Sequence, residues 1–264
     1  MKKFEIIDSH AHVFPGKIAK KATNAIGNFY GIEMKHVGTV EELKKSAAEI
    51  GVKRQVICSS ATNPSQVTAI NDFIYGLCCE NDKFVGYATL HPDYKDIDEE
   101  IFRIVERGFF GIKIHSDFQE FEIDSPKAVE MYRKIAKADL PILFHLGDEN
   151  GSLSSPTLLR KVLEKNNNIK AIGAHFGGYR RWDESMEQFK GVDMYFDTSS
   201  SLSFLSEDEV MKLFEAFGID RFFFGSDFPM WGHRDEFDRF MKLPLTNGEK
   251  ELILSGNFKR LFNI

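Results

Sequence analysis

Eight short apolar runs recur along the chain, and segments of helical character separate them. The runs cover residues 4–7, 52–59, 83–90, 109–114, 140–144, 169–174, 192–196 and 221–224. Most are apolar without interruption, which is typical of strands buried on both faces. Such strands alternating with helices predict an α/β fold with a parallel sheet, and eight units favour a closed (β/α)8 TIM barrel. An open, doubly wound sheet is the alternative.

Caps and prolines mark where several helices begin. Thr39-Val40-Glu41-Glu42 has the pattern of a capping box, and Ser125-Pro126 and Ser155-Pro156 each place a cap before a proline. Residues 15–38 are rich in glycine and predict a loop with some helix, inserted after the first strand. The 264 residues suit one barrel, and no low-complexity linker interrupts them. We therefore expect residues 1–264 to form a single domain, a barrel distorted by this insertion.

Composition narrows the classes of partner. The formal net charge of -6 argues against a nucleic acid or an anionic membrane as the partner. The three cysteines, Cys58, Cys78 and Cys79, form no CxxC pair and suit buried thiols in a reducing compartment. No apolar run approaches the length of a membrane span, and no apolar signal region follows the N-terminal lysines. We expect a cytoplasmic protein that acts on a small molecule.

Polar residues gather at the C-terminal ends of the predicted strands. In a barrel these ends meet at one mouth, where the active sites of this fold lie. The residues at these positions are His10, His12, Lys113, His115, His145, His175 and Asp227. His36 and His233 are instead expected on exposed segments. Because five of the eight histidines would collect at one place, the pattern indicates a functional site.

The stretch Ile6-Ile7-Asp8-Ser9-His10-Ala11-His12 opens this set. Alternation along a strand would point His10 and His12 to the same face, where two imidazoles can bind one metal ion. Taken alone, His10 and His12 could equally be ordinary polar residues at the end of a strand. The histidines at the other strand ends favour the metal site.

Motifs in consistent order resemble the amidohydrolase superfamily, and specifically its amidohydrolase 2 branch. They are Asp8-Ser9-His10-Ala11-His12, Gly111-Ile112-Lys113-Ile114-His115, Pro141-Ile142-Leu143-Phe144-His145, Ala174-His175-Phe176-Gly177-Gly178 and Phe224-Gly225-Ser226-Asp227-Phe228-Pro229. Residues 255–262 also resemble the closing helix of that branch. The resemblance covers nearly the whole chain, but it is poorly specific for the substrate.

The resemblance implies that His10, His12, His145 and Asp227 hold a divalent metal ion, with zinc as the expected ion. His175 would lie close by, as a further ligand or as an acid/base group. A metal with an open position lowers the pKa of bound water towards ~7, and a carboxylate such as Asp227 can accept the proton of that water. A helix N-cap is the alternative role of Asp227.

Lys113 bears on how many ions the resemblance implies. Binuclear relatives bridge two metals with a carboxylated lysine or a glutamate on the fourth strand, and Lys113 would serve if carboxylated. Mononuclear members also carry a lysine and a histidine there, and one metal per chain is favoured. Ser116 stands where many members have proline, which is a departure from the family pattern.

Further residues near the strand ends suit substrate contacts. They are Lys113, His115, Arg180, Arg181 and Trp231. An arginine can hold a carboxylate through two hydrogen bonds. Arg180 and Arg181 are equally compatible with a solvated helix start.

We predict hydrolysis of a small amide, lactone or ester by a metal-activated water. The alternative is non-oxidative decarboxylation of an aromatic or muconate-type acid at the same metal site. Decarboxylases of this branch tend to be longer, with insertions that form a dimer interface, so the compact chain favours hydrolysis. A TatD-like nuclease is disfavoured, because those enzymes carry a carboxylate on the fourth strand where this chain has Lys113 and His115. A homodimer is compatible with the sequence.

Overall fold

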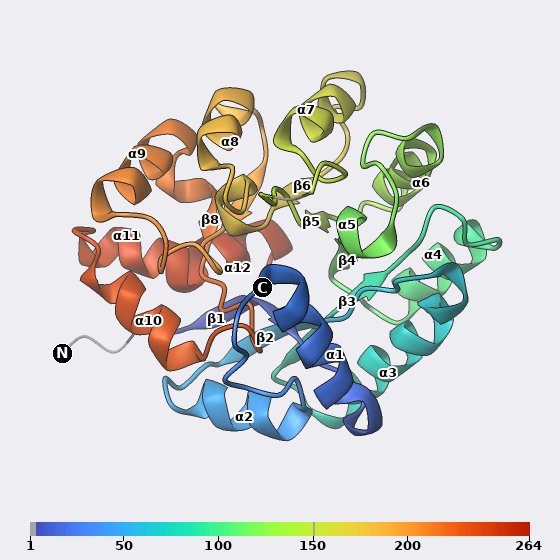
Figure 1. The fold of residues 1–264 in the computed structure, drawn as a ribbon, viewed down its shortest axis with the longest axis horizontal. Helices are drawn as coiled ribbons and strands as arrows, with labels where there is room; N and C mark the ends of the chain where they lie inside the picture. The colour runs from blue at the N-terminus through green and yellow to red at the C-terminus, as the bar shows by residue number, and fades with distance from the viewer. Residues whose placement is uncertain (1–3, 150) are drawn as a thin grey trace. The chain divides into compact units, whose positions relative to one another are not determined.

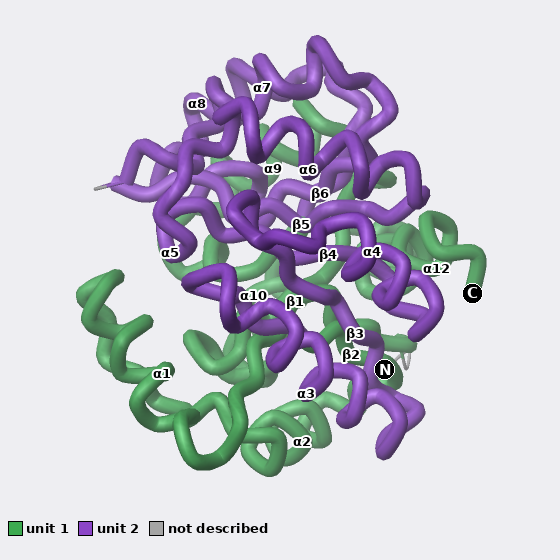
Figure 2. The backbone as a smooth tube through the Cα atoms, turned by 90° about the vertical axis from the view of Figure 1, so that its right-hand side faces the viewer, with its two compact units in different colours: residues 1–57, 197–264 green, residues 58–196 purple. Residues whose placement is uncertain are grey.

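The structure, a computed structural model, describes residues 4–149 and 151–264. The chain divides into two compact units (Figure 2). Unit 1 is formed by residues 1–57 and 197–264, and unit 2 by residues 58–196. That residues 1–264 form a single domain stays a prediction.

Unit 1 contains the elements nearest the two ends of the chain, coloured blue and orange to red in Figure 1. They are β1 (Ile7–His12), α1 (Gly16–Tyr30), α2 (Val40–Ala48), β2 (Arg54–Cys58), α9 (Glu207–Phe217), η3 (Ile219–Arg221), β8 (Phe222–Phe223), α10 (His233–Lys242), α11 (Asn247–Glu251), the π-helical turn η4 (Leu252–Gly256) and α12 (Asn257–Phe262). The last residue of β2, Cys58, belongs to unit 2. Helix α1 confirms the insertion expected after the first strand.

Unit 2 is a continuous segment in which strands and helices alternate. Its elements are η1 (Pro64–Gln66), α3 (Val67–Glu80), β3 (Phe84–Thr89), α4 (Ile97–Glu106), β4 (Gly111–Ile114), α5 (Ser116–Gln119), α6 (Pro126–Lys137), β5 (Ile142–Phe144), α7 (Pro156–Lys165), β6 (Ala171–Gly173), η2 (His175–Gly177), α8 (Trp182–Phe189) and β7 (Tyr195–Asp197). The last residue of β7, Asp197, belongs to unit 1.

The strands of unit 2 pair in parallel and in sequence order, from β3 to β7. Lys113 on β4 lies beside Thr89 on β3 and Leu143 on β5. Every residue of β3, β4, β5 and β6 is buried. This burial explains why these strands are nearly continuous apolar runs in the sequence.

The chain has the (β/α)8 TIM-barrel fold. Its strands follow the order β1 to β8 in the sheet, and helices separate successive strands. This order, with a helical connection after each strand, is that of the barrel. The predicted fold class is therefore confirmed.

Local signals in the sequence account for the helix starts. The side chain of Thr39 accepts a hydrogen bond from the amide of Glu42 (3.2 Å) at the start of α2. Ser155 does the same for Leu158 (3.2 Å) before Pro156 at the start of α7. Each bond satisfies an amide that the first turn of a helix leaves without an intrahelical partner.

Three predictions from the sequence were wrong in detail. The first strand covers residues 7–12 and not 4–7, so His10 and His12 lie within β1. His233, expected to be exposed, is fully buried. Cys58 is buried, but Cys79 is exposed on α3, so the three cysteines are not all buried thiols.

None of the helices in the described part of the chain has the length and apolar character that crossing a membrane requires.

Candidate active site

Three side chains of unit 1 converge at the end of β1. The Nε2 atoms of His10 and His12 lie 3.1 Å apart. Oδ1 of Asp227 lies 3.6 Å from Nε2 of His10 and 3.3 Å from Nε2 of His12. Alternation along the strand therefore brings the two imidazoles to one face, as expected. The three residues offer two nitrogens and one oxygen to the same small space.

Backbone contacts fix Asp227 beside β1. Its amide donates to the carbonyl of His10 (2.8 Å), and the amide of His12 donates to the carbonyl of Phe228 (2.6 Å). Ala11 and Phe228 form a parallel bridge. Asp227 itself has a φ of 55°, a left-handed conformation that is uncommon for residues other than glycine. The turn after β8 thus holds the carboxylate against the two histidines.

Asp8, two residues before His10 on β1, anchors the same turn. Its carboxylate is completely buried and accepts from the amide (2.9 Å) and the hydroxyl (2.6 Å) of Ser226. The side-chain amide of Gln55 donates to Oδ2 (2.9 Å), and Nε2 of His233 lies 2.9 Å from the same oxygen. A buried carboxylate requires such partners. Because these partners satisfy Asp8, β1 can continue through polar residues that were expected, from the sequence, to mark its end.

Asp197 is a site residue that the sequence reasoning missed. Its Oδ2 lies 2.9 Å from Nδ1 of His10, and both side chains are buried. The hydroxyl of Ser199 donates to the other oxygen of Asp197 (2.5 Å). Since a carboxylate only accepts, this contact places the proton of His10 on Nδ1 and leaves a lone pair on Nε2. The signal was available, because Asp197 is an acidic residue at the end of an apolar strand.

Nε2 of His10, Nε2 of His12 and Oδ1 of Asp227 can all act as acceptors. Their lone pairs repel one another at these distances unless a cation or a proton lies between them. Their separations of 3.1, 3.3 and 3.6 Å match the ~2.8–3.6 Å that bonds of about 2.0–2.2 Å to one ion would give. Two imidazole nitrogens and a carboxylate oxygen are also ligands that zinc and manganese accept. His10, His12 and Asp227 therefore fit a divalent ion.

Unit 2 brings three of the other predicted histidines together. Nδ1 of His145 lies 3.1 Å from Nε2 of His175. The ring of His115 is stacked between the rings of His145 and Phe118, with centroids 3.8 Å apart on each side. All three histidines are buried. That His145 joins His10, His12 and Asp227 at one ion, with His175 close by, stays a prediction.

Asp148 follows His145 on the loop after β5. Its Oδ2 lies 3.4 Å from Nε2 of His145. Burial, with a smaller contribution from the charge of Glu149, raises the pKa of Asp148 to about 7. The Asp148 side chain is therefore a buried acid and not a solvated loop charge.

The turn after β6 holds His175 in an uncommon conformation. His175 and Phe176 have φ values of 60° and 55°. The indole N–H of Trp182 donates to the carbonyl of His175 (3.0 Å), and the hydroxyl of Ser185 donates to the carbonyl of Phe176 (2.7 Å). A Cβ on Gly177 would lie 2.7 Å from the Ser185 oxygen, so the turn also requires a glycine there.

The predicted substrate residues have different surroundings. Lys113 is completely buried on β4. Arg180 is exposed with its guanidinium 5.8 Å from the ring centre of Tyr179, and Arg181 pairs with Glu184 at 2.5 Å. In unit 1, the guanidinium of Arg239 lies over the ring of Trp231 at 4.9 Å. Substrate contacts of these residues stay predictions.

Glu236 is a buried acid on α10 that the sequence did not single out. It is fully buried, and one of its oxygens accepts from Arg239 at 2.6 Å. Its other oxygen has no hydrogen-bond partner among the described residues. Burial raises the pKa of Glu236 to about 8, against the opposing effect of Arg239, and the charge of Asp227 raises it further.

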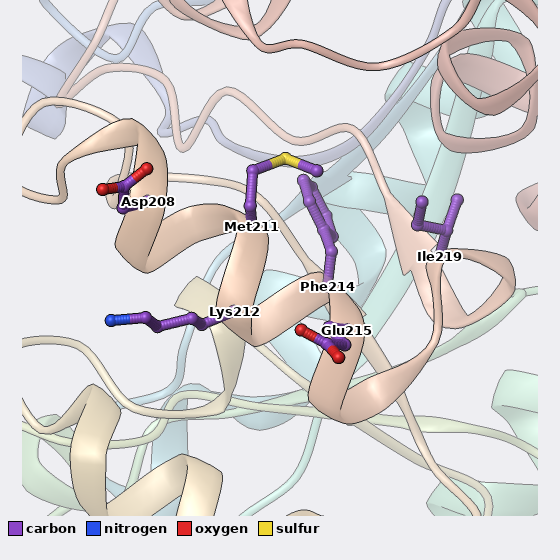
Figure 3. Close-up of a pocket in the computed structure, with 6 residues that line it drawn as sticks. All are labelled: Asp208, Met211, Lys212, Phe214, Glu215 and Ile219. Atoms are coloured by element: carbon purple, nitrogen blue, oxygen red, sulfur yellow. The ribbon is translucent and has the colours of Figure 1, made fainter.

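A surface groove on α9 is unrelated to these residues. It has a volume of about 490 Å³ and is lined by Asp208, Met211, Lys212, Phe214, Glu215 and Ile219. Figure 3 shows the side chains of Met211 and Phe214 side by side, with those of Asp208 and Lys212 directed away from them. Its lining contains none of the predicted site residues.

Comparison with known proteins identifies the family. The family model described as amidohydrolase matches residues 7–264. The chain belongs to this family. The resemblance of the histidine and aspartate motifs is thus confirmed at the level of the amidohydrolase family. A search of curated proteins finds no match.

Several solved structures are similar to this chain at low sequence identity. A TIM-barrel protein from Bordetella bronchiseptica superposes with a TM-score of 0.77, at 16% identity and over 98% of both chains. A dihydroxybenzoic acid decarboxylase from Polaromonas sp. JS666, with bound manganese and 2-nitroresorcinol, gives 0.74 at 13% identity, over 98% of this chain and 97% of the other. A probable 2-pyrone-4,6-dicarboxylic acid hydrolase from Acinetobacter baumannii gives 0.72 at 16% identity, over 98% and 100%. Decarboxylases of 5-carboxyvanillate and 2,6-dihydroxybenzoate are also similar.

The matches to the decarboxylases extend over nearly the whole of each chain. The match extends over 97% of the dihydroxybenzoic acid decarboxylase and 99% of the 5-carboxyvanillate decarboxylase. That decarboxylases of this branch are longer than this chain stays a prediction.

Proposed function

We propose that this protein is a metal-dependent decarboxylase that removes the carboxylate of an aromatic or muconate-type acid. The observation that carries the proposal is the convergence of Nε2 of His10, Nε2 of His12 and Oδ1 of Asp227 within 3.6 Å. Membership of the amidohydrolase family supports the metal. The similarity to decarboxylases of hydroxylated aromatic acids supports this reaction over the hydrolysis that the sequence favoured.

The proposed cofactor is a divalent ion held by His10, His12 and Asp227, with His145 as the further ligand that the resemblance implies. Manganese is bound to the similar decarboxylase, and zinc accepts the same nitrogen and oxygen ligands. When bound, the ion supplies positive charge that holds and neutralises anionic oxygens of the substrate. His10 presents its Nε2 lone pair because Asp197 holds its Nδ1 proton.

In the proposed reaction, the bond between a ring or chain carbon and the carboxylate carbon breaks, and the carboxylate leaves as CO2. A proton takes its place on the carbon that carried it. We assign this proton to Asp227, whose carboxyl delivers it and recovers one from water. The turn of Ser226 and Phe228 keeps Asp227 in place during this exchange, through the backbone bonds to β1.

Replacement of Asp227 by asparagine tests this assignment. The variant keeps the size of the side chain and one oxygen ligand but cannot carry the proton. General acid–base groups contribute about 10²–10⁴-fold in rate, so CO2 release should fall by that order. Metal content should fall less than in a His10→Ala, His12→Ala double variant. An Asp227→Asn protein with nearly full turnover would show that another group, with His175 as the first candidate, moves the proton.

Hydrolysis is the second candidate function. The similar 2-pyrone-4,6-dicarboxylic acid hydrolase favours it. In that reaction Asp227 would accept a proton from the attacking water. The two functions differ in their products, because a decarboxylase releases CO2 and a lactone hydrolase adds one water without losing carbon. Mass analysis of the products of both substrate classes therefore separates them.

A further inference from the structure

Ser200 makes a short, buried contact with the carboxylate of Asp227. It lies in the turn that follows β7 and is 1% exposed. Its hydroxyl donates to Oδ2 of Asp227 at 2.5 Å and also lies 3.4 Å from the sulfur of Met230. Ser200 and Asp227 both belong to unit 1. The contact is therefore internal to the unit that also holds His10 and His12.

Both partners of this contact have left-handed backbones. Ser200 has a φ of 54° and Asp227 a φ of 55°. Residues other than glycine adopt this region at a cost, and such strain is concentrated at functional sites. At Ser200 a glycine would relieve the strain but would remove the hydroxyl. The substitution Ser200→Gly therefore removes the hydroxyl while the backbone keeps its conformation.

The contact gives the two oxygens of Asp227 different environments. Oδ2 accepts from Ser200, while Oδ1 lies 3.6 Å and 3.3 Å from the Nε2 atoms of His10 and His12. The last torsion of an aspartate side chain is broad, so a hydrogen bond to one carboxylate oxygen narrows the range of its orientations. A hydrogen bond from a hydroxyl to a carboxylate is charge-assisted and stronger than a neutral one.

We propose that Ser200 is a positioning residue for Asp227, whose hydroxyl holds Oδ2 so that Oδ1 remains directed at His10 and His12. This inference deepens the proposed function and rests on it for its catalytic consequence. Ser200 acts only through Asp227. Its loss should therefore affect metal binding and turnover without removing any ligand atom.

The test compares Ser200→Gly with a control on the same turn, Ser201→Ala. Ser201 is equally buried, and its hydroxyl donates to the carbonyl of Ser199 (3.0 Å). The glycine variant accepts the positive φ, so it should fold as the wild type does. Two measurements are made on all three proteins: the affinity of the metal-free chain for Mn²⁺ by titration, and the orientation of Asp227 in crystal structures.

Ser200→Gly should bind Mn²⁺ at least about ten-fold more weakly than the wild type. Removing a group that orients a metal ligand lowers metal affinity by about 10–100-fold, and this is the lower end of that range. In its crystal structure Oδ1 of Asp227 should have turned away from the two histidines. Ser201→Ala should match the wild type in both measurements. At saturating Mn²⁺, kcat of Ser200→Gly for decarboxylation should fall while KM changes little.

An unchanged Asp227 orientation in Ser200→Gly, with Mn²⁺ affinity equal to that of the wild type, would overturn the inference. Equal weakening in Ser201→Ala would also overturn it, because the effect would then belong to the turn in general. Failure of the wild type to bind Mn²⁺ would overturn the proposed function instead. The crystal structures would still decide whether Ser200 orients Asp227.

Discussion

The Nδ1 atom of His10 lies 2.9 Å from Oδ2 of Asp197, and both side chains are sealed from solvent. Ser199 donates to the other oxygen of the same carboxylate. The carboxylate fixes the tautomer and the ring orientation of His10, and it raises the basicity of Nε2. One ligand of the proposed metal site is therefore oriented before any ion arrives.

The first prediction concerns this pair. Asp197→Asn keeps the shape of the side chain but replaces a carboxylate by an amide that can also donate, so the tautomer of His10 is no longer fixed. Metal affinity should fall by roughly 10–100-fold, the usual effect of removing such a group. Titration of the metal-free protein with Mn²⁺ measures it. Asp220→Asn, at an exposed carboxylate, is the matched control and should bind as the wild type does; equal affinities in all three proteins would refute the role of Asp197.

The second prediction concerns pH and the buried acid Glu236. Burial raises its pKa from 4.5 to about 8 in the folded protein. The folded state therefore binds this proton more tightly than the unfolded state does. The contribution of Glu236 to stability is complete below pH 4.5 and is lost as pH rises towards 8. Relative to Glu236→Gln, the free energy of unfolding of the wild type should fall by an amount on the order of a few kcal/mol across this window. Denaturant unfolding of both proteins at several pH values measures the difference, and parallel curves would contradict the shifted pKa.

Periodicity and turn residues were enough to predict the fold. The apolar runs of β3 to β6 are buried on both faces, and Thr39 and Ser155 cap the helices whose starts they marked. The boundary of β1 could not be predicted in this way. The partners that satisfy the buried Asp8 come from Ser226 and His233, more than two hundred residues away. Polar residues in a strand therefore looked like its end.

The candidate site was predictable where a residue of metal-ligand type stands at a strand end. His10, His12 and Asp227 meet that description, and they converge. Asp197 stands at the end of an apolar strand and could have been singled out, but its pairing with His10, 187 residues away, could not. Ser200 contacts Asp227, which lies 27 residues away. His233 was assigned to an exposed helix because nothing near it in sequence shows that Asp8 and Ser46 surround its ring. Such pairings depend on the tertiary fold.

The most direct test of the central claim measures CO2 released by the protein before and after its metal is removed. 2,6-Dihydroxybenzoate and 5-carboxyvanillate serve as the first substrates, followed by a panel of hydroxylated aromatic and muconate-type acids. The wild type should release one CO2 per acid consumed, lose this activity on chelation and regain it with Mn²⁺ or Zn²⁺. The His10→Ala, His12→Ala double variant should stay inactive with either ion. Equal CO2 release by the chelated wild type, or no release from any of these acids by the metal-loaded wild type, would contradict the account.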